Sequence, residues 1–111
     1  MKTEQPILIT SITAPADLSA KKNFFIGFDG NVCANGAKAL GVLNANTNLG
    51  NQAPVMTIGI ALTCSGAAIN QGAKVQSDAN GKAITLAAGE LNGYAMDAAA
   101  GADEFIRIKL V

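Results

Sequence analysis

The sequence contains no histidine and no tryptophan, and its aromatic residues are four phenylalanines and one tyrosine. Histidine is the commonest general base and metal ligand, so its absence excludes Ser-His-Asp and Cys-His catalysis and Cys-His metal sites. The glycines stand singly, and no Walker A or dinucleotide-binding pattern occurs. We therefore expect a protein that is not an enzyme, with no catalytic residues, no metal and no cofactor.

Paired carboxylates are the one acid–base arrangement that the composition still allows. Asp97, Asp103 and Glu104 come nearest to such a cluster, around an alanine- and glycine-rich stretch. Acidic side chains in such a turn are usually solvated surface groups, so we assign no catalytic role to them. The asparagine-rich stretch 44–52 offers amide oxygens to Ca²⁺, but it lacks the carboxylates that calcium sites use.

Charge is scarce and balanced, with eight Lys or Arg residues against eight Asp or Glu residues. The densest basic positions are Lys21-Lys22 and the alternating pair Arg107 and Lys109. Nucleic acid binding needs a basic stripe that neutralises phosphates, and none is visible. No stretch approaches the roughly 20 apolar residues of a membrane helix. We expect neither nucleic acid nor membrane as a partner.

Cys33 and Cys64 are the two cysteines, and they have no CxxC spacing. We expect buried free thiols rather than a disulfide or a metal site. Glu4 and Pro6 stand where a signal peptide needs an apolar run of roughly 7 to 15 residues. This pattern favours synthesis in a cytoplasm.

Short apolar runs alternate with Gly- and Asn-rich turns, and no long helix is indicated. The predicted strands are 6–13, 23–28, 39–43, 55–63, 94–96 and 105–111. In the second of these, alternation predicts that Phe24, Ile26 and Phe28 share the core face. The stretch 97–103 reads as a loop. We expect one all-β domain over residues 1–111, a small β-sandwich or partly open β-barrel of short antiparallel strands with little helix.

The clearest local signal is the stretch Gly72–Leu86, in which Asn80-Gly81 separates two alternating apolar runs. Such a pair predicts a β-hairpin, and Asp29-Gly30 predicts a second one. Gly59 lies inside a predicted strand, where a lone glycine indicates a bulge. The Gly72–Leu86 hairpin carries no catalytic group, so we interpret it as framework.

Much of the apolar content is alanine, which buries little area, and burial stabilises by about 25 cal/mol per Å². The core should therefore be thin, and contact with a partner would offset this. The N-terminal stretch 1–13, polar and then β-branched, has two interpretations: an arm that adds to the sheet edge of a neighbour, or the first strand of this domain.

From residue 41 onward, the order of elements resembles that of the small head-decoration, or capsid-cement, proteins of tailed bacteriophages. The segments that carry the resemblance are GVLN (41–44), PVMTIGIAL (54–62), GAAINQGAKV (66–75), SDANGKA (77–83), GYAM (93–96) and AAAGAD (98–103). The N-terminal third fits that family more loosely.

The resemblance implies a non-enzymatic virion structural protein on the outer surface of the capsid, assembled in the cytoplasm of a host bacterium. Such proteins bridge neighbouring subunits of the major capsid protein and stiffen the head. The resemblance also implies self-association, with a homotrimer expected and a dimer as the alternative.

Two other interpretations stay open. One is a β module associated with a phage tail or baseplate. The other is a glycan-binding β domain, which would need an exposed aromatic ring for stacking on a sugar. Tyr94 is the one ring outside the predicted strand faces.

Overall fold

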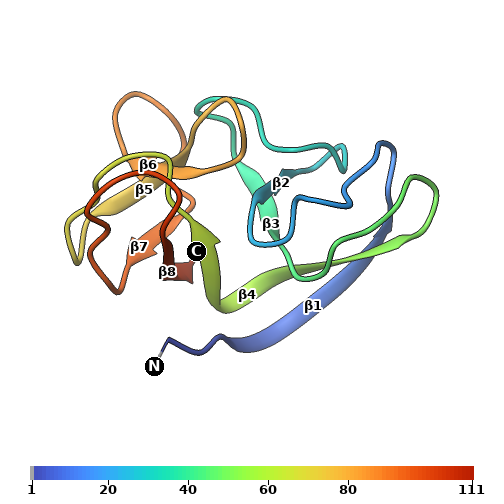
Figure 1. The fold of residues 1–111 in the computed structure, drawn as a ribbon, viewed down its shortest axis with the longest axis horizontal. Coiled ribbons are helices and arrows are strands. Elements are labelled where there is room, and N and C mark those ends of the chain that lie inside the picture. Colours follow the sequence, from blue (N-terminus) through green and yellow to red (C-terminus); the bar gives the residue numbers. More distant parts are fainter. Residues whose placement is uncertain (1) are drawn as a thin grey trace.

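The computed structural model describes residues 2–111, and these form eight β-strands and no helix (Figure 1). The strands are β1 (Gln5–Thr13), β2 (Phe25–Gly27), β3 (Ala39–Leu43), β4 (Gln52–Cys64), β5 (Lys74–Ser77), β6 (Ala83–Thr85), β7 (Gly93–Ala95) and β8 (Phe105–Leu110). Every named strand pair is antiparallel. The all-β prediction is confirmed, and no helix of the described chain is long and apolar enough to cross a membrane.

The strands form one sheet in the order β2-β3-β4-β8-β7-β5-β6, with β1 added to β4. The two ends of this order meet, because the Phe25 amide at β2 donates to the Gly81 carbonyl between β5 and β6 at 2.7 Å. The Gly36 amide, between β2 and β3, donates to the Ser77 carbonyl of β5 at 2.9 Å. The sheet is therefore nearly closed into a small barrel, as the sequence indicated.

The long strand β4 connects the two halves of the molecule. It pairs with β3 and β1 along its first part and with β8 from Ile60 onward. Gly59 lies where β4 bends, with a φ of +131°, and the register against β1 shifts opposite this region. A Cβ at Gly59 would lie 2.5 Å from the Gln5 carbonyl oxygen and 2.9 Å from the Ile7 nitrogen. The predicted irregularity is thus real, and only glycine lets β1 approach this closely.

Two apolar clusters lie on opposite faces of β2, β3 and the first part of β4. The larger cluster fills the barrel and includes Phe25, Val42, Met56, Val75, Ile106 and Ile108. The smaller cluster lies beneath the loops that precede β2 and β4, and it includes Leu18, Ile26, Leu43, Ala53 and Val55. These strands bury both faces, so alternation along them does not separate inside from outside.

The predicted core face of 23–28 is wrong in part. Phe25 is fully buried in the barrel, and Ile26 is buried in the smaller cluster on the other face. Phe24 is half-buried, with the Lys21 ammonium 5.2 Å from the centre of its ring. Phe28 is 71% exposed because β2 ends one residue earlier and Phe28 enters the turn.

Both predicted hairpin turns are present, and they share one geometry. In each, the turn ends on a glycine whose φ is positive, +86° at Gly30 and +77° at Gly81. The amide of that glycine donates to the carbonyl three residues earlier, at 3.0 Å from Gly30 to Gly27 and at 3.3 Å from Gly81 to Asp78. The Asp29 carboxylate accepts the amide of Asn31 at 3.0 Å, and Asp78 accepts two amides of its own turn at 2.8 and 2.9 Å. Side-chain acceptors and left-handed glycines make both turns rigid.

Candidate interaction surface

The three carboxylates considered as a catalytic cluster are each held by a different structural partner. Asp97 forms a bidentate pair with Arg107. Asp103 accepts from the Lys82 ammonium at 2.6 Å, and Glu104 accepts two backbone amides of the preceding loop at 3.0 and 3.1 Å. Within residues 2–111 no three Cys, Asp or Glu side chains gather as a metal site would require. These acids hold loops against strands.

The cysteines are buried and free, as predicted. Burial raises the pKa of the Cys33 thiol and that of the Cys64 thiol, because a thiolate loses its hydration inside the protein. A thiol with a raised pKa is a poor nucleophile at neutral pH. Neither residue is suited to covalent chemistry.

Tyr94 lies on β7 in a row that crosses the sheet. Its neighbours are Lys74 on β5 and Lys109 on β8, and Lys109 in turn faces Ile60 on β4. The ring is half-buried in this row rather than presented on a loop. The glycan-binding interpretation of Tyr94 stays a prediction.

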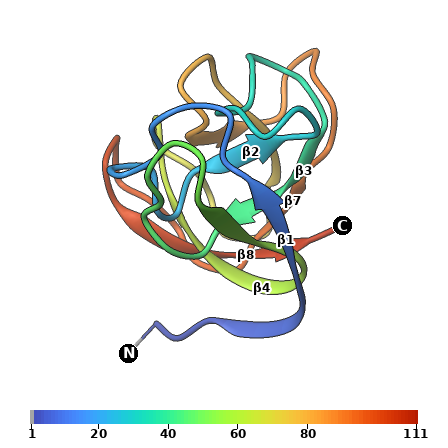
Figure 2. The ribbon, with the colours of Figure 1, turned by 90° about the vertical axis from the view of Figure 1, so that its right-hand side faces the viewer.

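The most unusual surface is the edge strand β1. Among the residues described, β1 pairs with β4 on one edge and with no strand on the other (Figure 2). Three consecutive apolar side chains are exposed along it, Ile7 at 78%, Leu8 at 50% and Ile9 at 40%. An edge strand with unpaired backbone groups and exposed apolar residues is a site where another chain can add.

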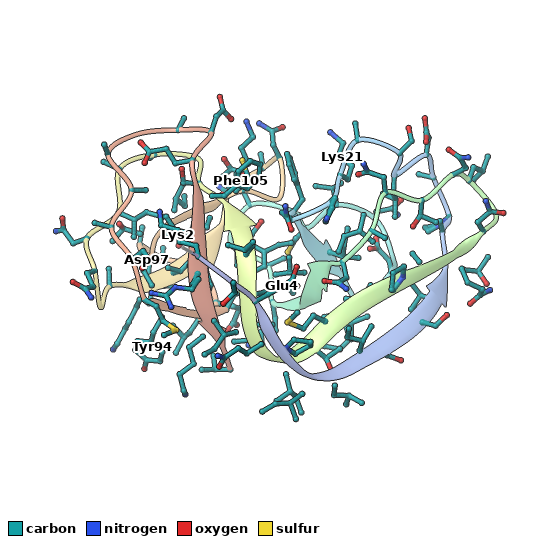
Figure 3. The ribbon with its side chains drawn as sticks, turned by 60° about the horizontal axis from the view of Figure 1, so that its bottom comes forward. Lys2, Glu4, Lys21, Tyr94, Asp97 and Phe105 are labelled. Carbon is teal, nitrogen blue, oxygen red and sulfur yellow. The ribbon has the colours of Figure 1, made fainter. Side chains whose placement is uncertain are left out.

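A groove of about 350 Å³ adjoins β1 at the bend of β4. It is lined by Ile7, Ile58, Gly59, Ile60, Lys109 and Leu110. Figure 3 shows this side of the molecule, with the N-terminal segment passing over β8 between Lys2 and Glu4. The Lys2 ammonium donates to the Phe105 carbonyl at 3.2 Å, which ties the start of the chain to β8. We call this opening the β4-bend groove; its walls are aliphatic and one rim is cationic.

Two turns elsewhere present single large apolar side chains. Phe28 stands in the turn after β2, and Leu49, 64% exposed, stands in the turn before β4. The sequence had offered residues 1–13 as an arm for a neighbouring sheet and the asparagine-rich stretch 44–52 as a surface loop, but it placed Phe28 on the core face. A further signal for the edge position of β1 is Pro6, because proline within a strand indicates an edge.

Comparison with known proteins gives two findings. A family model described as phage cement protein matches residues 2–110. The fold is similar to the crystal structure of the head fiber gp8.5 N base in bacteriophage phi29, with a TM-score of 0.76 and 15% sequence identity, over 94% of this chain and 95% of that chain. At this identity the structural likeness shows the fold alone. No curated protein matches.

Proposed function

The chain belongs to the phage cement protein family, and from this we propose that it decorates the outer surface of a phage capsid and bridges neighbouring major capsid protein subunits. The family makes it a structural protein of the phage head. The position on the outer surface, the bridging and the absence of any catalysis are our proposal. The exposed apolar edge of β1 is the observation that carries it.

A cement protein acts by contact, and the features of this chain suit that role. Its turns are rigid, and its acidic groups are used to hold loops. On a symmetric shell each copy makes several contacts. Once one contact has formed, the effective concentration for the others is high, so no single contact needs to be tight. We propose that residues 1–13 supply one contact, with the free edge of β1 pairing with a strand of a capsid subunit.

The backbone of Ser11 shows how this edge can be tested. Ser11 faces Pro54, which has no N–H, and the Pro54 carbonyl accepts from the Asn44 amide at 2.9 Å. Ser11 therefore belongs to a non-hydrogen-bonded pair, and its own N–H points away from β4 toward the free edge.

The experiment adds purified protein to heads stripped of it and measures the bound copies per head. Wild type should bind saturably with a fixed stoichiometry. Ser11→Pro removes the outward N–H and should weaken binding at least tenfold, whereas Ser11→Ala, which loses only the 2.8 Å side-chain bond to Gln52, should bind like wild type. Absence of binding by wild type contradicts the proposed function, and equal binding by both variants contradicts the role of β1.

A further inference from the structure

We propose that copies of this chain associate head to tail, with Phe28 of one copy in the β4-bend groove of the next and Asp29 beside Lys109. The inference rests on the proposed function, because it identifies the contact between neighbouring copies on the shell. It uses two surfaces of the same chain: an exposed aromatic side chain next to a carboxylate, and an aliphatic groove with a lysine on its rim, neither charge being ion-paired within residues 2–111.

The protruding surface is the Phe28 turn, residues 27–31. Phe28 is 71% exposed, more than any other aromatic ring of the described chain. The turn is held by Asp29, which accepts the Asn31 amide at 3.0 Å and its side-chain amide at 3.2 Å. A Cβ at Gly30 would lie 2.9 Å from Pro15, so the turn packs tightly against the loop before β2. A rigid protrusion loses little conformational entropy on binding.

The receiving surface is the β4-bend groove. Its aliphatic walls include Ile7, 78% exposed, and Ile58, 48% exposed, and both leave apolar area in water. Gly59 adds no side chain there. An aromatic side chain buries about 150–250 Å² in a well-matched site, which makes it a typical anchor of an interface.

Charge complements shape at this contact. Asp29 follows Phe28 directly, its pKa is lowered by the two hydrogen bonds from Asn31, and it forms no ion pair with any residue in 2–111. Lys109 lies on the rim of the groove, exposed and likewise without an ion pair in that part of the chain. Phe28 in the groove would bring these two unpaired charges together. Leu49, the other exposed tip, has only asparagines and a glycine beside it and offers no such match.

The geometry requires two different surfaces to meet. In Figure 1 the turn that follows β2 lies in the upper half of the view, and the bend of β4 lies at the bottom. A contact between unlike surfaces is heterologous, and it closes into a ring when the rotation between copies permits. Three copies are the smallest number that such a contact can close into a symmetric ring.

Native mass spectrometry and sedimentation of the isolated full chain test the contact. Wild type should form closed trimers, and Phe28→Ser should raise the dissociation constant at least tenfold while thermal unfolding of the monomer changes little. Leu49→Ser removes an equally exposed apolar side chain and is the matched control, expected to assemble like wild type.

Charge reversal separates this contact from a general loss of apolar area. Lys109→Glu should weaken assembly at least tenfold, whereas Lys74→Glu, at an exposed lysine of the same sheet that does not line the groove, should assemble like wild type. A monomeric or dimeric wild type, equal effects of Phe28→Ser and Leu49→Ser, or equal effects of Lys109→Glu and Lys74→Glu overturns the inference. Binding to stripped heads is scored separately, so intact trimers that do not bind heads contradict only the proposed function.

Discussion

Asp97 and Arg107 form a bidentate ion pair that ties the loop after β7 to the middle of β8. Arg107 Nη2 donates to Asp97 Oδ1 at 2.8 Å, and Nε donates to Oδ2 at 3.0 Å. The Arg107 backbone amide also donates to Oδ2 at 3.0 Å. Asp97 and Lys2 are labelled side by side in Figure 3, and the positive charge of Lys2 also lowers the pKa of Asp97. Parallel, charge-assisted bonds of this kind are stronger than ordinary surface ion pairs.

Removal of the Asp97 charge should destabilise the fold at neutral pH. We expect Asp97→Asn to lower the free energy of unfolding by about 1–2 kcal/mol, since the pair is only partly exposed. Glu90→Gln, at an exposed carboxylate with no ion pair in the described chain, is the control and should change little.

The Asp97–Arg107 pair also makes the free energy of unfolding depend on pH, and the pKa of Asp97 gives the direction of that dependence. Hydrogen bonds from Arg107 are the largest cause that lowers the pKa of Asp97 from 3.8 to about 2. The stabilisation is therefore fully present above pH 3.8 and is lost as the pH falls toward 2. Urea unfolding of wild type and Asp97→Asn at several pH values should give curves that converge between these limits; a constant difference would refute this assignment.

Gly59, the single glycine of strands β1 and β4, should not tolerate replacement. Alanine there would have a φ of +131° and a Cβ 2.5 Å from the Gln5 carbonyl oxygen, so β1 must move away. We expect Gly59→Ala to cost more than about 2 kcal/mol and to speed amide exchange in β1. Gly101→Ala, with open space around the added Cβ and no positive φ, should be nearly neutral. Unchanged exchange in β1 would contradict this role.

The two thiols should be protected in the folded protein. Burial raises the pKa of both Cys33 and Cys64, so little thiolate forms at neutral pH and a reagent has little access. We expect modification by a thiol reagent to be at least tenfold slower than in denaturant. Ser11→Cys places a thiol on the exposed edge of β1, and its modification rate is the reference for an accessible cysteine. If Cys33 or Cys64 were modified at that rate in the folded protein, the buried positions would be contradicted.

Elements whose structure depends on neighbours in the sequence were predictable. The turns at Asp29-Gly30 and Asn80-Gly81 follow from residues that tolerate positive φ, and strand β3 has the predicted bounds. Strand β8 alternates because only one of its faces is covered, with Ile106 and Ile108 buried. The resemblance to cement proteins likewise rested on the order of such local segments, and the family match confirms it.

The tertiary structure decided what depends on which segments meet. Phe25 rather than Phe28 fills the barrel, because β2 is covered on both faces and ends at Gly27. Ile7 and Ile58 are large and apolar, yet they are exposed because nothing within residues 2–111 covers this side of the β1–β4 ribbon. Asp97 and Arg107 come within hydrogen-bond distance because β7 pairs with β8. Local preferences determine turns and strands, whereas inside and outside are set by contacts between distant segments, which a single sequence does not reveal.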